Sequence, residues 1–274
     1  MQPIITIKEA QKILEQNNGE VTVSLDLGIS ESTIIIKDRI VLLDKQKIPL
    51  TEFEKVKENT CYVADENTLK KAAFFSDETN FYYKIIPTSD WPTFTLSSTP
   101  MHRHTNISPK QDTETKIAVI NPIKGKVLDT CCGFGYTAIM AAKDAELVHT
   151  FERDKFVINL ASYNPHSLEL FTNKKIKLVE KDVNTEIGKF EKEYFDRVIH
   201  DPPTLKYSPE LFSENFYLEL YRVMKKGAIL YHYCPNPKKT HGNQFYEKIM
   251  KKLEDTGFKE VRYIEKASGI REIK

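Results

Sequence analysis

The chain has 274 residues, of which 40% are hydrophobic and 29% charged, and its formal net charge at pH 7 is +1. This composition is ordinary for a globular protein with one large domain or two modest ones. No apolar run approaches the roughly 18 residues that a membrane-spanning helix requires, and residues 1–6 do not resemble a signal peptide. The four cysteines are scattered, which favours reduced thiols. We therefore expect a cytoplasmic protein with no membrane partner.

The first hundred residues predict a small β-rich domain. Their alternating or clustered apolar residues, separated by polar turns, are typical of short strands. We expect a helix over residues 8–16 and strands over residues 20–26, 32–36, 39–43 and 80–86. The domain is placed at residues 1–97, and a link bearing prolines runs from Trp91 to Pro100. Residues 1–100 hold 11 Lys and Arg against 15 Asp and Glu, a net of −4, which does not favour a dedicated RNA-binding appendage.

The most informative pattern follows in residues 127–135, where an apolar strand ends at Asp129 and turns through Gly133 and Gly135. A helix is expected to begin near Tyr136. Glycine admits backbone angles closed to other residues and lets a ligand lie against the main chain, while the first N–H groups of a helix are unpaired. An acid at the strand end suits an ammonium group or ordered water. The segment has no Gly-Lys-Ser/Thr ending and no third glycine, so a P-loop and a dinucleotide fold are both disfavoured.

Three further strands are expected to end at polar residues. They cover residues 147–151, 176–180 and 195–200. Glu152 follows the first of them, about 20 residues after the glycine loop, where an acid can accept both hydroxyls of a ribose. Asp182 and Val183 follow the second and could receive the amine and the ring face of an adenine. Because helical segments alternate with these strands, we expect a mostly parallel sheet with ligands at the carboxyl ends of its strands.

At these motifs, over roughly residues 112–274, the chain resembles the class I S-adenosyl-L-methionine-dependent methyltransferases. The resemblance implies an α/β fold with a Rossmann-like sheet of seven strands, mostly parallel with the last strand antiparallel. We place this domain at residues 98–274. A last helix is expected over residues 243–255, followed by hairpin strands over residues 261–265 and 270–273.

The resemblance also implies S-adenosyl-L-methionine as the cofactor. The implied cofactor-binding residues are Asp129, Cys131, Gly133, Gly135, Tyr136, Glu152, Arg153, Asp182, Val183 and Asp201. A finer resemblance is to an archaeal group of predicted methyltransferases with an Asp-Pro-Pro-Thr motif. It is carried by the segments Met101-His102-Arg103, Asp129-Thr130-Cys131, His200-Asp201-Pro202-Pro203 and Tyr231-His232-Tyr233.

The segment Asp201-Pro202-Pro203-Thr204 is implied to be catalytic. In relatives with an Asp/Asn-Pro-Pro-aromatic motif, the acid and a proline carbonyl accept hydrogen bonds from an amino group and direct its lone pair at the sulfonium methyl. Positioning then supplies much of the rate. Thr204 departs from the aromatic residue that stacks on a flipped base in nucleic-acid methyltransferases. This departure makes a planar base less secure as the target, although Tyr207 lies three residues on.

We expect transfer of a methyl group to an amino or ring nitrogen, with an RNA base of tRNA or rRNA as the favoured acceptor. One alternative is an N-methyltransferase acting on a protein or a small amine. Another is an aminopropyltransferase of the spermidine-synthase type, disfavoured because the chain lacks a Gly-Gly-Gly-Asp-Gly loop and has a diproline in place of an acid-rich segment. A third is a non-catalytic subunit that binds S-adenosyl-L-methionine. The sequence leaves the oligomeric state open.

Cys234, after the expected fifth strand at residues 228–233, permits a carbon-methylating mechanism by a thiolate. RNA 5-methylcytosine enzymes also carry a cysteine where this chain has Thr204, so we expect Cys234 to be a partly buried thiol. His200 and His232 are expected to be buried and hydrogen-bonded, and the histidine spacing does not indicate a metal site. Most of the basic residues are expected to form a solvated face, and the Lys238-Lys239 pair is the best candidate among them to face the substrate.

Overall fold

The computed structural model describes residues 2–235 and 243–274. The chain divides into two compact units, which we treat separately. The first holds the residues up to Lys110 together with Asn159–Leu168, and the second holds Gln111–Ile158 and the residues from Glu169 onward. Within the described ranges, every helix is too short or too polar to traverse a lipid bilayer.

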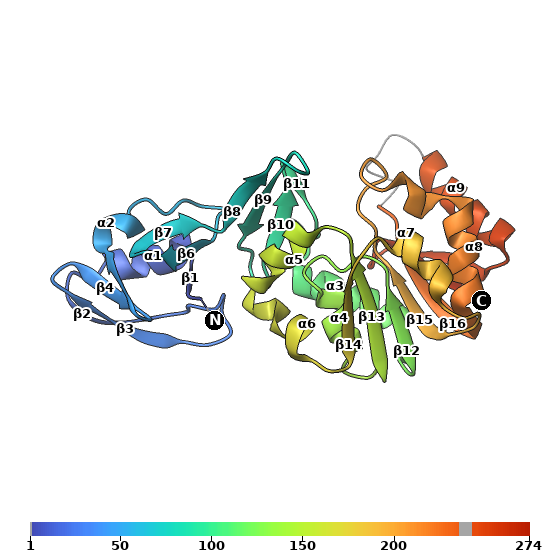
Figure 1. The fold of residues 1–274 in the computed structure, drawn as a ribbon, viewed down its shortest axis with the longest axis horizontal. Coiled ribbons are helices and arrows are strands. Elements are labelled where there is room, and N and C mark those ends of the chain that lie inside the picture. The colour runs from blue at the N-terminus through green and yellow to red at the C-terminus, as the bar shows by residue number, and fades with distance from the viewer. Residues whose placement is uncertain (1, 236–242) are drawn as a thin grey trace. The chain divides into compact units, whose positions relative to one another are not determined.

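The first unit consists of antiparallel hairpins (Figure 1). Its elements are β1 (Ile4–Ile5), α1 (Ile7–Leu14), β2 (Gly19–Val23), β3 (Ser32–Lys37), β4 (Ile40–Leu43), β5 (Gln46–Pro49), α2 (Leu50–Phe53), β6 (Tyr62–Asp65), β7 (Thr68–Lys71), β8 (Ala73–Ser76), β9 (Phe81–Ile86), β10 (Thr93–Leu96) and β11 (Thr99–Pro100). Among the described residues they form sheets in the orders β2-β3-β4-β5, β1-β6-β7 and β11-β10-β9-β8. The strands alternate as the sequence predicts: Ile34 and Ile36 are buried in the core, while Ile35 is exposed.

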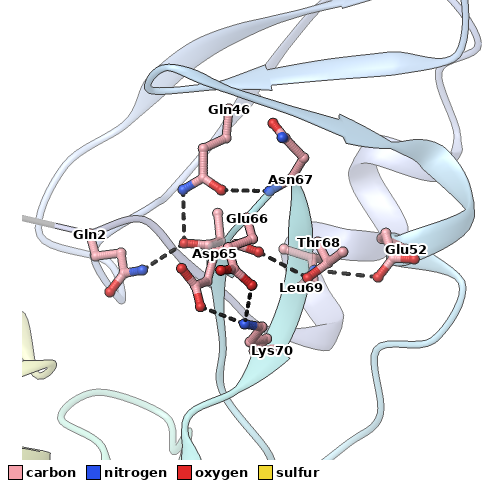
Figure 2. Close-up of polar contacts among 10 residues, drawn as sticks. Gln2, Gln46, Glu52, Asp65, Glu66, Asn67, Thr68, Leu69 and Lys70 are labelled. Carbon is pink, nitrogen blue, oxygen red and sulfur yellow. Dashed lines mark hydrogen bonds and ion pairs between the residues drawn. The ribbon is translucent and has the colours of Figure 1, made fainter.

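The β6–β7 hairpin is held by a network of polar contacts at its turn (Figure 2). Glu66 and Asn67 have positive φ angles of 50° and 61°, as two-residue hairpin turns require. The side chain of Gln46 donates to the Ala64 carbonyl at 3.0 Å and accepts from the Asn67 N–H at 3.0 Å, which joins the turn to β5. Lys70 pairs with Asp65 and Glu66 on the exposed side of the turn. These contacts stabilise the β6–β7 hairpin. We did not expect this hairpin from the sequence, because the segment is rich in charged residues.

The second unit is an α/β sheet. The elements from residue 109 onward are α3 (Pro109–Val119), β12 (Lys126–Asp129), α4 (Tyr136–Ala141), β13 (Leu147–Glu152), α5 (Lys155–Ser162), η1 (Pro165–Ser167), α6 (Leu168–Thr172), β14 (Ile176–Glu180), α7 (Val183–Glu186), η2 (Ile187–Lys189), β15 (Phe195–His200), η3 (Pro209–Phe212), α8 (Glu214–Val223), β16 (Met224–Tyr233), α9 (Asn243–Thr256), β17 (Lys259–Ile264) and β18 (Gly269–Ile273). Of these, η1 and the second half of α5 fall in the first unit. In the described residues the sheet has seven strands in the order β14-β13-β12-β15-β16-β18-β17. The pairs among β12 to β16 are parallel, and β18 runs antiparallel to both of its neighbours. The predicted fold class is confirmed.

Helices cover both faces of this sheet because its central strands are apolar on both sides (Figure 1). Val127 and its neighbours on one face pack with α3 and α4. Leu128, the next residue of the same strand, faces the opposite way and packs with α8 and α9. Because β12, β13 and β15 run parallel, their carboxyl ends meet at one edge of the sheet, where Asp129, Glu152 and Asp201 stand.

At the opposite, amino edge of the sheet, Asp196 joins the starts of three strands. Its carboxylate accepts from the Lys126 N–H at 2.9 Å and from Lys225 Nζ at 2.8 Å. Partial burial acts to raise the pKa of Asp196, but the hydrogen bonds from Lys225 and Lys126 outweigh it and lower the pKa overall. Gly125 has φ of 61°, and a Cβ there would lie 2.1 Å from Asp196 Oδ2, so the turn before β12 must be glycine.

Candidate active site

Asp129, the last residue of β12, is fully buried and braces the loop that follows it. Its Oδ1 accepts a hydrogen bond from Thr137 Oγ1 at 3.1 Å, and its Oδ2 accepts one from Thr150 Oγ1 at 2.6 Å. Because Thr137 lies on α4 and Thr150 lies opposite Asp129 on β13, one carboxylate joins β12, β13 and α4. Burial raises the pKa of Asp129 to about 7, although the hydroxyl groups act to lower it. Contact between Asp129 and an ammonium group stays a prediction.

The loop between β12 and α4 has two glycines in the left-handed region. Gly133 has φ of 54°, and Gly135, the N-cap of α4, has φ of 76°. These angles are strained for a residue that carries a Cβ. A Cβ on Gly135 would also lie 2.8 Å from Leu170 Cδ2, so both conformation and space require glycine there.

Glu152 stands at the end of β13 and faces the glycine loop. Its Oε2 accepts from the Gly133 N–H at 3.0 Å, and its Oε1 accepts from the Asp154 N–H at 3.0 Å. Burial raises the pKa of Glu152 to about 7, against the lowering effect of these N–H donors. The carboxylate is thus held in one orientation at the strand end, while the residue stays partly exposed.

Arg153 links the end of β13 to the segment after β15. Its Nη1 lies 2.8 Å from Glu210 Oε1, and its Nη2 donates to the Tyr207 carbonyl at 2.6 Å. Arg153 Nη1 also lies 3.5 Å from Asp182 Oδ2. Asp182 is the N-cap of α7, where its Oδ1 accepts from the Asn184 N–H at 2.8 Å. The two predicted residues Arg153 and Asp182 are therefore brought together, on a half-exposed surface.

Other predicted cofactor-binding side chains are mainly enclosed by protein. Val183 lies in the core beneath α8, and Tyr136 packs edge-to-face on Phe134 with ring centroids 5.9 Å apart. Cys131 is partly exposed, and burial, followed by the charge of Glu152, raises the pKa of its thiol well above the usual value. Cys131 is consequently a neutral thiol at physiological pH, and its contact with a cofactor stays a prediction.

Asp201, directly after β15, has a partner that the sequence did not reveal. Lys116 Nζ, on α3, lies 2.7 Å from Asp201 Oδ2 and 2.8 Å from Asp112 Oδ2. The Lys116 side chain is only 5% exposed, and its ammonium group lies 5.1 Å from the centre of the Tyr233 ring. The only sequence signal for this group was the spacing of Asp112 and Lys116, which places them one helical turn apart.

The Asp201 segment meets the glycine loop. The charge of Asp201 contributes to raising the pKa of both Asp129 and Cys131, so these groups share one electrostatic neighbourhood with Glu152. Pro202 is buried, Pro203 is partly buried and Thr204 is exposed. The Thr204 carbonyl accepts from the Tyr207 N–H at 2.8 Å, which closes a turn after the diproline.

His200 and His232 are buried and hydrogen-bonded, as expected. His200 Nε2 lies 3.0 Å from the Leu211 carbonyl and Nδ1 lies 2.8 Å from Thr130 Oγ1. Because a carbonyl only accepts, Nε2 carries the proton, and Nδ1 accepts from the threonine. Burial lowers the pKa of His200 to about 3, so the ring is neutral. His232 Nε2 lies 2.9 Å from the Tyr217 hydroxyl.

Two further sequence expectations concern metals and basic residues. Within the part of the chain that the structure describes, there is no group of three or more His, Cys, Asp or Glu side chains placed to hold a metal ion. The Lys238-Lys239 pair lies outside the described residues.

Comparison with known proteins identifies the family. Residues 111–216 match the family model described as the methyltransferase small domain. The chain is 37% identical to the uncharacterised protein MJ1233 of Methanocaldococcus jannaschii over 283 residues, which span 98% of this chain and 95% of that relative. The chain belongs to the same family as MJ1233. It is an S-adenosyl-L-methionine-dependent methyltransferase, and the matched domain contains the glycine loop and Asp201.

Solved structures support the fold alone. A spermidine synthase in complex with the transition-state analogue AdoDATO is 19% identical with a TM-score of 0.60, covering 73% of this chain and 71% of that one. The spermidine synthase of Thermotoga maritima is 19% identical with a TM-score of 0.58, covering 73% and 70%.

The residues present fit the methyl donor, whose sulfonium and ammonium groups are both cationic. Asp129 and Glu152 bring carboxylates to one edge of the sheet, and burial has raised the pKa of both to about 7. A cation placed beside them would favour their ionised forms. The glycine loop, whose residues Gly133 and Gly135 carry no side chain, lies at the same edge.

Proposed function

We propose that this methyltransferase acts on an amino or ring nitrogen, and that the nitrogen belongs to an RNA base of tRNA or rRNA. One observation carries the proposal: the Asp201 carboxylate stands at the carboxyl edge of the sheet, beside the glycine loop, and is paired with the buried ammonium group of Lys116. An ionised carboxylate accepts hydrogen bonds and donates none. It therefore suits an acceptor that presents an N–H group.

The donor supplies a methyl group that is already activated by its positive sulfur, so the protein has to position the acceptor. Asp201 would accept a hydrogen bond from the acceptor N–H and direct the nitrogen lone pair towards the methyl carbon. The Pro202 carbonyl would accept a second hydrogen bond, and proline has no backbone N–H group that would compete with it. Glu152 and the glycine loop would hold the nucleoside part of the donor.

The thiols argue against carbon methylation, which needs a thiolate to add to a pyrimidine ring. Burial raises the pKa of Cys234 to about 12, with the charge of Glu272 as the second cause. The pKa values of Cys61, Cys131 and Cys132 are also raised, with burial as the first cause. None of the chain's cysteines is therefore set up as a nucleophile.

Two features favour a planar, uncharged acceptor over a polyamine. The Tyr233 ring lies beside Lys116, which contacts Asp201, and offers an aromatic surface that Thr204 does not. Residues 101–274 hold 29 Lys and Arg against 24 Asp and Glu, a net of +5, which is compatible with a polyanionic substrate.

The proposal is tested with methyl-labelled S-adenosyl-L-methionine and separate pools of tRNA, rRNA, protein and small metabolites. We expect label in RNA and, after digestion, in one N-methylated nucleoside. Label in protein or in a small amine would show that the acceptor belongs to that class and not to RNA. Transfer of an aminopropyl group from the decarboxylated donor would overturn methyl transfer altogether.

The Asp201→Ala variant separates binding from chemistry. Donor affinity, measured by calorimetry, should stay nearly intact while turnover is abolished, because Asp201 is assigned to the acceptor. Equal loss of both would make Asp201 a structural or donor-binding acid. Donor binding by the wild type with no label in any pool would indicate a non-catalytic subunit.

A further inference from the structure

Lys116 is enclosed between two carboxylates. Its Nζ lies 2.8 Å from Asp112 Oδ2 and 2.7 Å from Asp201 Oδ2, and the three side chains are 5%, 2% and 21% exposed. Asp112 and Lys116 are one turn apart on α3, whereas Asp201 lies 85 residues further along the chain. The ammonium group therefore connects a helix to the strand end that carries the catalytic segment.

The arrangement differs from an ordinary helical ion pair. On a surface, such a pair contributes little to stability. Removing an ammonium group from water is costly unless its N–H groups are satisfied. Burial alone acts to lower the pKa of Lys116, but the charges of Asp201 and Asp112 outweigh it and raise the pKa above its ordinary value. The two carboxylates thus favour the ionised form of Lys116.

The position of the ammonium group is fixed by the core. Ile117 is 7% exposed and Ile120 is fully buried, and both pack α3 against the sheet. On the sheet, His200 and His232 form the last registered pair of β15 and β16, so Asp201 and Tyr233 follow at neighbouring strand ends. Lys116 contacts both of these residues. A lysine in this setting has little freedom to follow a moving carboxylate, and so it determines where the carboxylate lies.

We propose that Lys116 is a positioning residue for methyl transfer: its ammonium group keeps Asp201 ionised and sets the orientation in which the carboxylate meets the acceptor nitrogen. The inference rests on the proposed role of Asp201. It also bears on the acceptor class, because an ionised carboxylate requires an acceptor that presents an N–H group.

Several charged or titratable groups surround the Lys116–Asp201 pair. Asp112 on α3 and Tyr233 at the end of β16 both contact Lys116. Asp129 and Cys131 come from β12 and its loop. Because the Lys116 ammonium group lies 2.7 Å from Asp201 Oδ2, its removal should raise the titration midpoint of Asp201 by about 1–3 pH units, the effect of losing a close opposite charge.

The test uses Lys116→Met in an Asp112→Asn background. The single Lys116→Met variant would leave Asp112 buried without its partner, which destabilises the fold on that account alone. The double variant avoids this effect. Circular dichroism and calorimetry with S-adenosyl-L-methionine establish that the fold and donor binding are kept. Lys225→Met is the matched control, because it breaks an Asp–Lys pair at the opposite edge of the sheet.

The first readout is carbon NMR of selectively labelled aspartate carboxyl groups in the full-length protein, with the Asp201 signal assigned from Asp201→Asn. We expect its midpoint to rise in the double variant and to stay unchanged in Lys225→Met. Lys116→Arg should keep the midpoint near that of the wild type but lower turnover, since it preserves the charge and alters the geometry. An unchanged midpoint in the double variant would overturn the proposal and leave Lys116 a structural residue.

The second readout is the pH profile of kcat/KM with the RNA pool that accepts label. Its acidic limb should move upward in the double variant by the same amount as the NMR midpoint. The two readouts separate the two proposals. If the NMR midpoint shifts but the acidic limb of the kinetic profile does not, Asp201 does not act on the acceptor and Lys116 does not position it for methyl transfer. The ion pair between Lys116 and Asp201 would still be established.

Discussion

The main-chain N–H of Gly133 donates a 3.0 Å hydrogen bond to the carboxylate of Glu152, which joins the loop after β12 to the end of β13. The acid expected to hold the ribose therefore also holds the loop against which the donor would lie. The Glu152 side chain therefore links the expected ribose contact to the position of the glycine loop.

Glu152→Ala should weaken binding of S-adenosyl-L-methionine by about 1–3 kcal/mol, or roughly 5- to 150-fold in Kd, because the ribose hydroxyls lose a charged acceptor. Calorimetry measures the change. The matched control is Glu180→Ala, since Glu180 is the exposed residue opposite Glu152 on β14. Unchanged affinity in Glu152→Ala would reject the ribose assignment.

Donor affinity should depend on pH near neutrality. Burial raises the pKa of Glu152 and of Asp129 to about 7, and a cationic donor with hydroxyl groups favours the ionised carboxylates. Protonation competes with binding, so affinity should fall as pH drops below about 7, by up to about tenfold per pH unit and per group. Titrations at pH 6 and pH 8 measure this effect, which should be smaller in Glu152→Gln. A flat profile in the wild type would contradict it.

Gly135→Ala should destabilise the protein through two separable effects. Its φ of 76° costs about 1–2 kcal/mol for a residue with a Cβ, and the contact at 2.8 Å with Leu170 adds about 1–3 kcal/mol of overpacking. Gly227→Ala is the control for the first effect, because Gly227 has φ of 75° and no atom of the described residues lies within 4 Å of the added Cβ. Urea denaturation measures both variants.

The overpacking part should shrink when Leu170 is truncated. Gly135→Ala is therefore expected to cost less free energy of unfolding in a Leu170→Ala background than in the wild type. Equal costs in the two backgrounds, or equal costs for Gly135→Ala and Gly227→Ala, would show that contact with Leu170 plays no part.

Cys234→Ser should retain methyl transfer within about tenfold, or roughly 1.4 kcal/mol. The buried thiol has its pKa raised to about 12, so it is not a nucleophile at neutral pH. RNA containing a 5-fluoropyrimidine should form no covalent complex with the wild type. A trapped complex that disappears in Cys234→Ser would replace the nitrogen assignment with a carbon one.

Glu272 should make the protein less stable as pH rises. It is fully buried on β18, and neither carboxyl oxygen has a hydrogen-bond partner among the described residues. Burial raises its pKa well above the ordinary value of 4.5, so the folded protein keeps a proton that the unfolded chain releases. The stabilising effect of that proton is complete below the unfolded pKa and is lost as pH rises towards the folded pKa, at about 1.4 kcal/mol per pH unit.

Glu272→Gln removes this titration and keeps the shape of the side chain. Its advantage over the wild type in free energy of unfolding should therefore grow between pH 5.5 and pH 7.5, as urea denaturation would measure. Glu180→Gln, at an exposed position, should show no such trend. A constant difference between Glu272→Gln and the wild type would mean that Glu272 titrates normally in the fold.

The sequence predicted the catalytic sheet well because its strands are apolar runs that stop at acids. The expected strands at residues 176–180 and 195–200 coincide with β14 and β15. The antiparallel last strand also follows the expectation from the family resemblance. In the first unit, the hairpins from β5 to β8 were not predicted, because short strands such as Thr68–Lys71 are rich in polar residues.

The burial of two charged residues, Lys116 and Glu272, could not be predicted from the sequence. Lys116 lies in a polar helix segment that is typical of a solvated surface, and its partner Asp201 is distant in the chain. Glu272 lies two positions from the buried Ile270, so strand periodicity turns it inward, whereas the usual preference of glutamate predicts exposure. Only tertiary packing decides such conflicts, and in both cases packing buried the charged residue.

The Asp196 junction at the amino edge of the sheet has a consequence for how this protein can change. It ties β12, β15 and β16 together at their starts, while the same strands carry Asp129, Asp201 and Tyr233 at their far ends. Substitutions near Asp196 can therefore raise or lower the melting temperature with little effect on the reacting groups. Thermal adaptation and acceptor choice can evolve separately along the same strands, each at its own end.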